Sequence, residues 1–378
     1  MEQRLKVLIE SINETNKTRR ALEWKKQGKK VIGVLCSYIP EEVIYAAGML
    51  PWQITAAEQT SFSRAMTYRR PMSALYCNAI LESLLTGQLD FLDGVVASNR
   101  EQDLTRLWDV WVYLDKTPFA PIINVPYLDS DLARRQMSKE IKRLIGLLEK
   151  FGGLKITEAS LRDAIKVFNK TRELLTRLYE MRKREAPPVS GAEAMAIVAA
   201  STIMPKDEFN RELEALLPYL DKRKTSLKHL HPRILVSSDT LHDPAFIELV
   251  EEAGCLVAMD DLDPGSRYFW EAVDTSLTDP VEALSRRYLS RPGHPRMFPW
   301  DSQVQQVIDW VKEYKIDGVL EMPEKYSIPR EFRVPYFRTR LAEAGIPNIS
   351  LQRFYNATEM GQLRVRIEAF REMLESPV

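Results

Sequence analysis

The chain has 378 residues, which suits two or three domains, and 45% of them are hydrophobic, which is enough to build globular cores. Lys plus Arg number 53 and Asp plus Glu also number 53, so the formal net charge is zero. This balance excludes the broad positive field that binds nucleic acid or an anionic membrane surface, and the composition excludes a disordered or fibrous chain.

Strand and helix patterns alternate through the first third of the chain. After an opening helix, residues 29–36 form a short apolar run that is typical of a buried parallel strand, and Pro40, Glu41 and Glu42 suit the first turn of a helix that ends at Gly48. Further strands are predicted at residues 52–55, 92–97 and 121–125, and helices at 77–85 and 104–113. Such alternation predicts a doubly wound α/β domain.

Amphipathic helices replace the strands in the middle of the chain, with Thr157, Ser190 and Asp207 as caps or first-turn residues. The α/β alternation then returns, with strands predicted at 233–237, 256–259, 318–320 and 348–350 and helices at 246–253, 332–344 and 360–374. We therefore expect two Rossmann-like α/β domains with parallel sheets, joined by a helical connector and enclosing a cleft. The expected divisions are an N-terminal helix at 1–28, a first domain at 29–130, a connector at 131–230, a second domain at 231–355 and a C-terminal helix at 356–378.

No sequence motif marks a nucleotide or zinc site. The chain lacks the glycine-rich fingerprints for dinucleotides and ATP and the paired histidines of zinc enzymes, so no flavin, NAD or ATP site is expected. The longest apolar runs, at 31–40 and 194–205, are too short to span a membrane. The start of the chain does not resemble a signal peptide, and Cys36, Cys77 and Cys255 are too few and too widely spaced for a disulfide framework, so a cytoplasmic location with reduced thiols is expected.

Ligands of doubly wound domains bind beyond the carboxyl ends of the strands, so the loops after the first strands of the two domains are the candidate site. Ser37 lies in the first of these loops, next to a helix start, where it can contact a ligand or simply cap the helix. Residues 260–267 contain Asp260, Asp261 and Asp263 together with Arg267. We interpret this segment as a solvated acidic turn rather than a metal site, with Arg267 as an ion-pair partner.

Several segments in order resemble the 2-hydroxyacyl-CoA dehydratase and benzoyl-CoA reductase family, in particular its smaller subunit. The similarity extends over nearly the whole chain, from about residue 24 to 375. It rests on GVLCSYIPEEVIYAAG at 33–48, DGVV at 93–96, DLTRL at 103–107, NKTR at 169–172, DD at 260–261, GSRY at 265–268, DGV at 317–319 and GQLRVR at 361–366.

This resemblance implies an enzyme of two homologous subunits, each with a four-iron, four-sulfur cluster between its two domains, that acts on an acyl-CoA thioester. A separate ATPase activator would supply one electron, and a ketyl radical would allow either dehydration or ring reduction. The three cysteines that usually hold the cluster align here with Cys77, Gln102 and Ser327, while Ser37 would contact the thioester carbonyl or the substrate hydroxyl.

The replacement of two thiolates leaves two readings open, because an amide and a hydroxyl are poor ligands for soft iron. In the first, the chain is a catalytic or electron-relaying subunit with an atypically ligated 4Fe-4S cluster held by Cys77. In the second, it is a cluster-free subunit or paralogue that binds acyl-CoA or pairs with a cluster-bearing homologue or with itself. A hinged α/β protein that closes on a small ligand is a third, unrelated alternative.

Overall fold

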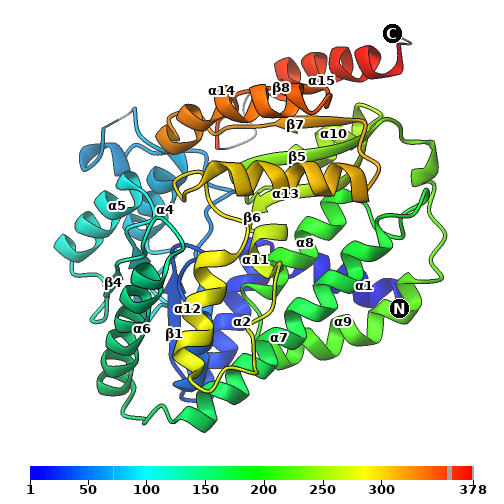
Figure 1. Cartoon of the computed structure of the whole chain (residues 1–378). Coiled ribbons are helices and arrows are strands. Elements are labelled where there is room, and N and C mark those ends of the chain that lie inside the picture. Colours follow the sequence, from blue (N-terminus) through cyan, green and yellow to red (C-terminus); the bar gives the residue numbers. More distant parts are fainter. Residues whose placement is uncertain (71, 356–359, 377–378) are drawn as a thin grey trace.

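Two parallel four-stranded sheets form the centres of the two halves of the chain in this computed structural model, which describes residues 1–70, 72–355 and 360–376 (Figure 1). The first sheet has the order β2-β1-β3-β4, with β1 (Val31–Val34), β2 (Leu50–Gln53), β3 (Gly94–Ser98) and β4 (Ile122–Ile123). The second has the order β6-β5-β7-β8, with β5 (Arg233–Thr240), β6 (Leu256–Asp263), β7 (Gly318–Glu321) and β8 (Asn348–Ser350). The predicted fold class is confirmed.

The first sheet is built on β1, whose four residues are all buried because helices cover both faces of a parallel sheet. Its register places Val34 beside Gln53 of β2 and Val96 of β3. The helices of this half are α1 (Glu2–Glu10), α2 (Glu14–Lys26), α3 (Glu41–Ala46), the 3-10 turn η1 (Ala65–Thr67), α4 (Leu75–Leu85) and α5 (Gln102–Tyr113). The first 28 residues form two helices because the Asn13 side chain caps a new helix by accepting from the Asn16 N–H, 2.9 Å away.

The central helices are α6 (Asp131–Gly152), α7 (Glu158–Met181), α8 (Gly191–Ser201) and α9 (Lys206–Leu220), followed by the 3-10 turn η2 (Leu227–His229). Thr157 and Ser190 cap α7 and α8 as predicted, and Ser190 forms a capping box with Glu193. Asp207 lies in the first turn of α9, also as predicted. Because α3 packs on α7 while α8 packs on α10 and β6, these helices brace both sheets.

The second half carries α10 (Ala245–Glu252), α11 (Ser266–Phe269), α12 (Pro280–Ser290), α13 (Trp300–Glu313), α14 (Ile328–Glu343) and α15 (Met360–Glu375). Helix α12 leaves the second sheet and lies beside α6, so the two halves interlock (Figure 1). The predicted C-terminal segment 356–378 begins at residues 356–359 and ends at 377–378, both outside the described residues, and α15 occupies the part between them.

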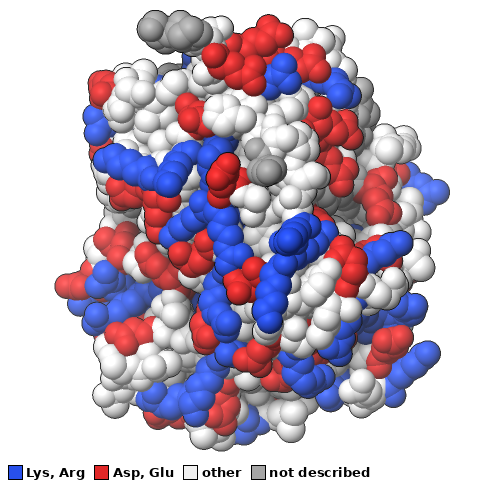
Figure 2. Space-filling view, turned by 90° about the vertical axis from the view of Figure 1, so that its right-hand side faces the viewer, with Lys and Arg blue, Asp and Glu red and all other residues white. Residues whose placement is uncertain are grey.

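The surface carries both signs of charge in close proximity. Figure 2 shows a column of Lys and Arg side chains on one face with Asp and Glu side chains beside it along its length. This mixture agrees with the zero net charge of the chain. Within the described ranges, we find no helix with the length and apolar character needed to cross a membrane.

Candidate functional site

The two sheets share the same strand order and therefore the same topological switch points. In each sheet the strand order reverses next to the first strand, and this switch point lies between β1 and β3 in the first sheet and between β5 and β7 in the second. Ligands of such folds bind at this point, beyond the carboxyl ends of the strands. Ser37 and Arg100 follow β1 and β3, whereas Asp239 lies near the end of β5 and Glu324 follows β7. Both switch points therefore carry polar side chains, and all four of these side chains are buried.

A hydrogen-bonded ion-pair network joins the first of these switch points to the end of β6 in the second half. The Ser37 hydroxyl donates to Asp263 Oδ2 at 2.7 Å and accepts from Arg291 Nη2 at 2.8 Å. Arg100 Nη1 also donates to Asp263 Oδ2, at 2.9 Å. No member is more than 4% exposed. We call Ser37, Arg100, Asp263 and Arg291 the interdomain network, because the first two belong to the first half and the others to the second.

The acidic segment beside this network differs from the sequence expectation. Asp260, Asp261 and Asp263 lie in β6 and are buried, so the interpretation as a solvated turn is wrong. Arg267 explains the difference because its guanidinium binds Asp261 through Nε at 2.6 Å and Nη2 at 2.7 Å. Although burial opposes ionisation of Asp261, this ion pair holds the pKa of the carboxyl well below its usual value. The expected ion-pair role of Arg267 is confirmed.

A second group of buried acids lies where α4, α5 and α14 begin. Glu324 Oε1 accepts the backbone N–H of Tyr76 at 3.0 Å, and the Tyr76 hydroxyl contacts Glu101. Ser327 donates to Asp239 Oδ2 at 2.6 Å. Burial, together with neighbouring carboxylates, raises the pKa of Glu324 to about 8 and that of Glu101 well above its usual value. Glu324 therefore favours its protonated form at neutral pH, while Glu101 also accepts from Arg100 Nη2 at 3.2 Å.

The structure separates the residues that the sequence grouped as a site. Ser37 is part of the interdomain network. Cys77 lies buried in the first turn of α4, and Ser327 begins α14, so both are near the Glu324 carboxyl. Gln102 is exposed and lines a separate hollow with Asn99, Thr105, Tyr127 and Arg296.

The donor groups do not fit a conventional iron–sulfur cluster. Cys36 follows β1 with its sulfur 2.9 Å from the Ser98 hydroxyl, Cys77 lies in α4, and Cys255 precedes β6. Burial raises the pKa of all three thiols and so disfavours the thiolate that binds iron. Among the described residues, no three His, Cys, Asp or Glu side chains are arranged to hold a metal ion.

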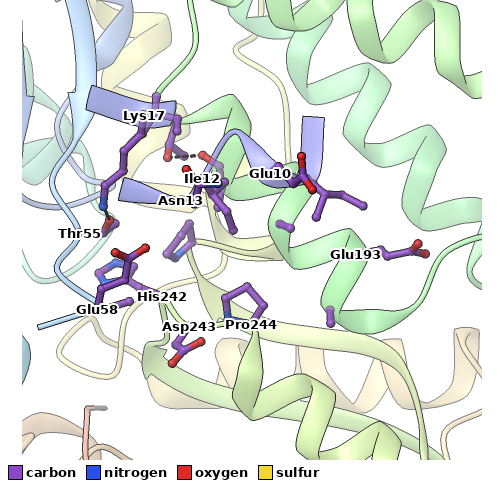
Figure 3. Close-up of a pocket in the computed structure, with 18 of the residues that line it drawn as sticks. Glu10, Ile12, Asn13, Lys17, Thr55, Glu58, Glu193, His242, Asp243 and Pro244 are labelled. Carbon is purple, nitrogen blue, oxygen red and sulfur yellow. Dashed lines mark hydrogen bonds between the residues drawn. The ribbon is translucent and has the colours of Figure 1, made fainter. Parts of the chain in front are cut away.

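A cavity of about 430 Å³ opens beside the network, and we call it the seam cavity (Figure 3). Thr55, His242 and Pro264, which follow β2, β5 and β6, line it together with residues from the α1–α2 corner and α8. Lys17 reaches in from α2 and donates to the Thr55 hydroxyl at 3.1 Å. The cavity is also lined by five carboxylate side chains, those of Glu10, Glu58, Glu193, Asp243 and Glu248.

His242 in the wall of the seam cavity is a neutral imidazole, since burial lowers its pKa to about 3. Its Nδ1 lies 2.8 Å from the Tyr355 hydroxyl, whose oxygen accepts the Ala56 N–H at 3.3 Å. This chain of hydrogen bonds joins the loop after β2 to the second half.

Sequence reasoning missed most of the network. Arg100 follows β3 by two residues, and the strand-end rule that selected Ser37 would have found it too. Arg291 follows α12 and lies 254 residues from Ser37, and no local pattern marks it. His242 and Glu324 follow β5 and β7 closely, but their burial is decided by packing of the opposite half.

The whole chain is similar to proteins of one known family. The family model of the 2-hydroxyglutaryl-CoA dehydratase D-component matches residues 36–374. The chain is 25% identical to the beta subunit of (R)-2-hydroxyglutaryl-CoA dehydratase from Acidaminococcus fermentans, over 98% of this chain and 100% of the relative. It is 26% identical to a benzoyl-CoA reductase subunit from Thauera aromatica, over 94% of each chain, and 23% identical to the (R)-phenyllactyl-CoA dehydratase beta subunit from Clostridium sporogenes, over 93% of each. The resemblance drawn from the sequence is thereby confirmed, and the chain belongs to the 2-hydroxyglutaryl-CoA dehydratase D-component family.

Proposed function

We propose that the chain is a subunit of an acyl-CoA-processing enzyme of the 2-hydroxyacyl-CoA dehydratase and benzoyl-CoA reductase type, and that it binds the thioester without carrying an iron–sulfur cluster. The observation that carries the proposal is the interdomain network, which joins the switch point of the first sheet to the carboxyl end of β6 in the second sheet and lies next to the seam cavity. In this proposal the sheets open to admit the substrate, because every network residue is buried in the closed form.

The network offers the groups that a hydroxyacyl thioester needs. Among the described residues, Arg100 Nε and Arg291 Nε are buried donors without a partner, and Asp263 Oδ1 is a buried acceptor without one. A thioester carbonyl would accept a hydrogen bond from an arginine. A substrate hydroxyl would donate to Asp263, either at its free oxygen or in place of the Ser37 hydroxyl. These residues would bind and orient the substrate while the closed sheets exclude water.

The proposed partner is a homologous subunit that carries the cluster. Its support is the chain's end-to-end similarity to proteins named as subunits, together with the poor fit of this chain's own donor groups to a cluster. A separate ATP-dependent activator would supply the electron for ketyl-radical dehydration or reduction in the assembled enzyme. Three buried free cysteines suit a reducing compartment, and we place the protein in the cytoplasm.

Anaerobic purification of the full chain, followed by iron and sulfide analysis and by equilibrium dialysis with (R)-2-hydroxyglutaryl-CoA and benzoyl-CoA, tests the proposal. We expect no stoichiometric iron and saturable binding of at least one thioester. A full cluster on each chain would contradict the cluster-free assignment, and loss of that iron in Cys77→Ser would make Cys77 its ligand. Absence of thioester binding, alone and after mixing with a cluster-bearing homologue, would contradict the acyl-CoA role.

A further inference from the structure

A second pocket, of about 440 Å³, lies between the segment before α4 and helix α5, and it shares no lining residue with the seam cavity. Three arginines from two segments line it: Arg69 and Arg70 lie in the chain before α4, and Arg106 lies on α5. We call it the arginine pocket, and among the described residues it is lined by Tyr68, Arg69, Arg70, Ser73, Asp103, Arg106, Asp109 and Val110.

The charges of the arginine pocket leave it positive. Arg69 is buried and fixed, since its Nε donates to Asn78 Oδ1 at 2.8 Å and its Nη2 to Asp103 Oδ1 at 3.0 Å, which neutralises Asp103. Arg70 and Arg106 are exposed, and their side chains form no hydrogen bond or ion pair with other described residues. In the described lining, these two guanidinium groups are therefore balanced by one remaining carboxylate, that of Asp109.

The chemistry of this lining selects a phosphorylated ligand with an aromatic group. A guanidinium group binds phosphate oxygens through parallel hydrogen bonds, and the ring of Tyr68, which is 45% exposed, offers a face on which a nucleobase can stack. We propose that the arginine pocket binds the phosphorylated nucleotide end of the CoA thioester. This inference rests on the proposed function and specifies where the part of the substrate that does not react is held.

The seam cavity is unsuited to that end of the substrate. Five carboxylates and one lysine line it, of which Glu193 pairs with Arg223 and Glu10 with Lys6, and its described lining offers no arginine to several phosphates. The acyl group and the uncharged arm of the thioester meet no such repulsion at the seam. The two parts of the substrate thus suit two different places on the surface of the protein.

The first turn of α4 connects the arginine pocket to the seam. On the pocket side, the Ala74 N–H donates to Asp103 Oδ2 at 3.2 Å. On the other side, the Tyr76 N–H donates to Glu324 Oε1 at 3.0 Å, and Arg100 Nη2 lies 3.5 Å from the Tyr76 hydroxyl. One turn of helix therefore separates pocket residues from the interdomain network, and the flexible arm of CoA would pass this turn when the sheets open.

Isothermal titration calorimetry of the full chain with CoA, and with inorganic phosphate as the competing probe, tests the proposal. The double variant Arg70→Gln/Arg106→Gln is expected to bind CoA at least tenfold more weakly, because each charge-assisted contact contributes about a tenfold factor. Tyr68→Leu is expected to weaken binding severalfold through lost stacking. Lys116→Gln removes the same charge from an exposed site just beyond α5 and is expected to leave CoA affinity unchanged.

The outcomes separate this inference from the proposed function. Wild-type affinity for CoA in the double variant would overturn the arginine pocket as the subsite and leave the acyl-CoA role intact. Competition by inorganic phosphate as strong as that by CoA itself would overturn the nucleotide assignment and leave only an anion site. Failure of the wild-type chain to bind any CoA thioester would overturn both. All substituted side chains are exposed, and matching urea midpoints would confirm intact folding.

Discussion

Ser37 joins two charged groups from the second half of the chain, so we expect its hydroxyl to affect stability. We expect Ser37→Ala to lower the free energy of unfolding by about 1–3 kcal/mol, because Asp263 and Arg291 lose a buried hydrogen-bonding partner. Urea denaturation measures the change, and Ser63→Ala, at an exposed position, is the control. Equal stability of the two variants would contradict a contribution of these two hydrogen bonds to folding, which replace the helix cap that the sequence offered, since α3 begins at Pro40 without a side-chain cap.

Glu324 gives the protein a specific pH dependence. Its pKa is raised to about 8 in the folded protein, against a usual value of 4.5. Between these two pH values the folded state therefore keeps a proton that the unfolded state has already released. This contribution to stability is complete below pH 4.5 and is lost as the pH rises through 8. We therefore expect Glu324→Gln to be more stable than the wild type at pH 8.5, with the difference shrinking towards pH 5.

Chemical denaturation at several pH values tests this expectation. Glu343→Gln, at an exposed position at the end of α14, the helix that follows Glu324, controls for the loss of a carboxylate. Parallel stability curves for Glu324→Gln and the wild type between pH 5 and 8.5 would contradict a protonated Glu324. His242 acts in the opposite direction, since its pKa is lowered to about 3 and stability is lost as the pH falls below about 6.5.

Substitutions at two glycines, one in a strand and one in a helix, test how closely these elements are packed. A Cβ at Gly94, the first residue of β3, would lie 2.8 Å from the Phe119 carbonyl oxygen, whereas one at Gly146 in α6 would meet no atom within 4 Å. We expect Gly94→Ala to destabilise the protein by about 1–3 kcal/mol and Gly146→Ala to stabilise it by about 0.5–1 kcal/mol. Thermal melts of both variants check the opposite signs, and a harmless Gly94→Ala would mean that the β3–β4 edge is loosely packed.

The positions of elements, though not their ends, followed from the sequence where the pattern was local: β1 was predicted at 29–36 and spans Val31–Val34. Capping by Thr157 and Ser190 and the short apolar runs of β1 and β3 were predicted correctly from neighbouring residues. Strand β6 runs to Asp263, four residues beyond the prediction, because Arg267 neutralises an acid that hydropathy assigns to solvent. A pattern of apolar residues does not register charge compensation from another element.

At the scale of the molecule, the Arg100–Asp263 ion pair holds the two halves together. Both side chains are 3% exposed. Removing one partner leaves a buried charge, so we expect Arg100→Met and Asp263→Leu each to lower stability by about 3–5 kcal/mol and the double variant to lose less than their sum. Small-angle X-ray scattering should show a larger radius of gyration in the single variants.

The exposed pair of Arg286 and Glu282 on α12 provides the matching control. We expect a coupling energy below about 1 kcal/mol there, because solvent screens exposed charges. Additive effects of the Arg100 and Asp263 substitutions, with no change in the radius of gyration, would show that the helical connector alone fixes the two halves.

Local patterns in the sequence determined the α/β class, the two sheets, the capped connector helices and the family, because apolar periodicity and cap residues act over a few positions. They also pointed to Ser37 through the strand-end rule. Only the tertiary structure decided what Ser37 contacts and which acids are buried, and it set Gln102 apart from Cys77 and Ser327. The physical reason is that burial and ion pairing depend on residues more than 200 positions away, such as Asp263 and Arg291, which only the packing of one sheet against the other brings to Ser37.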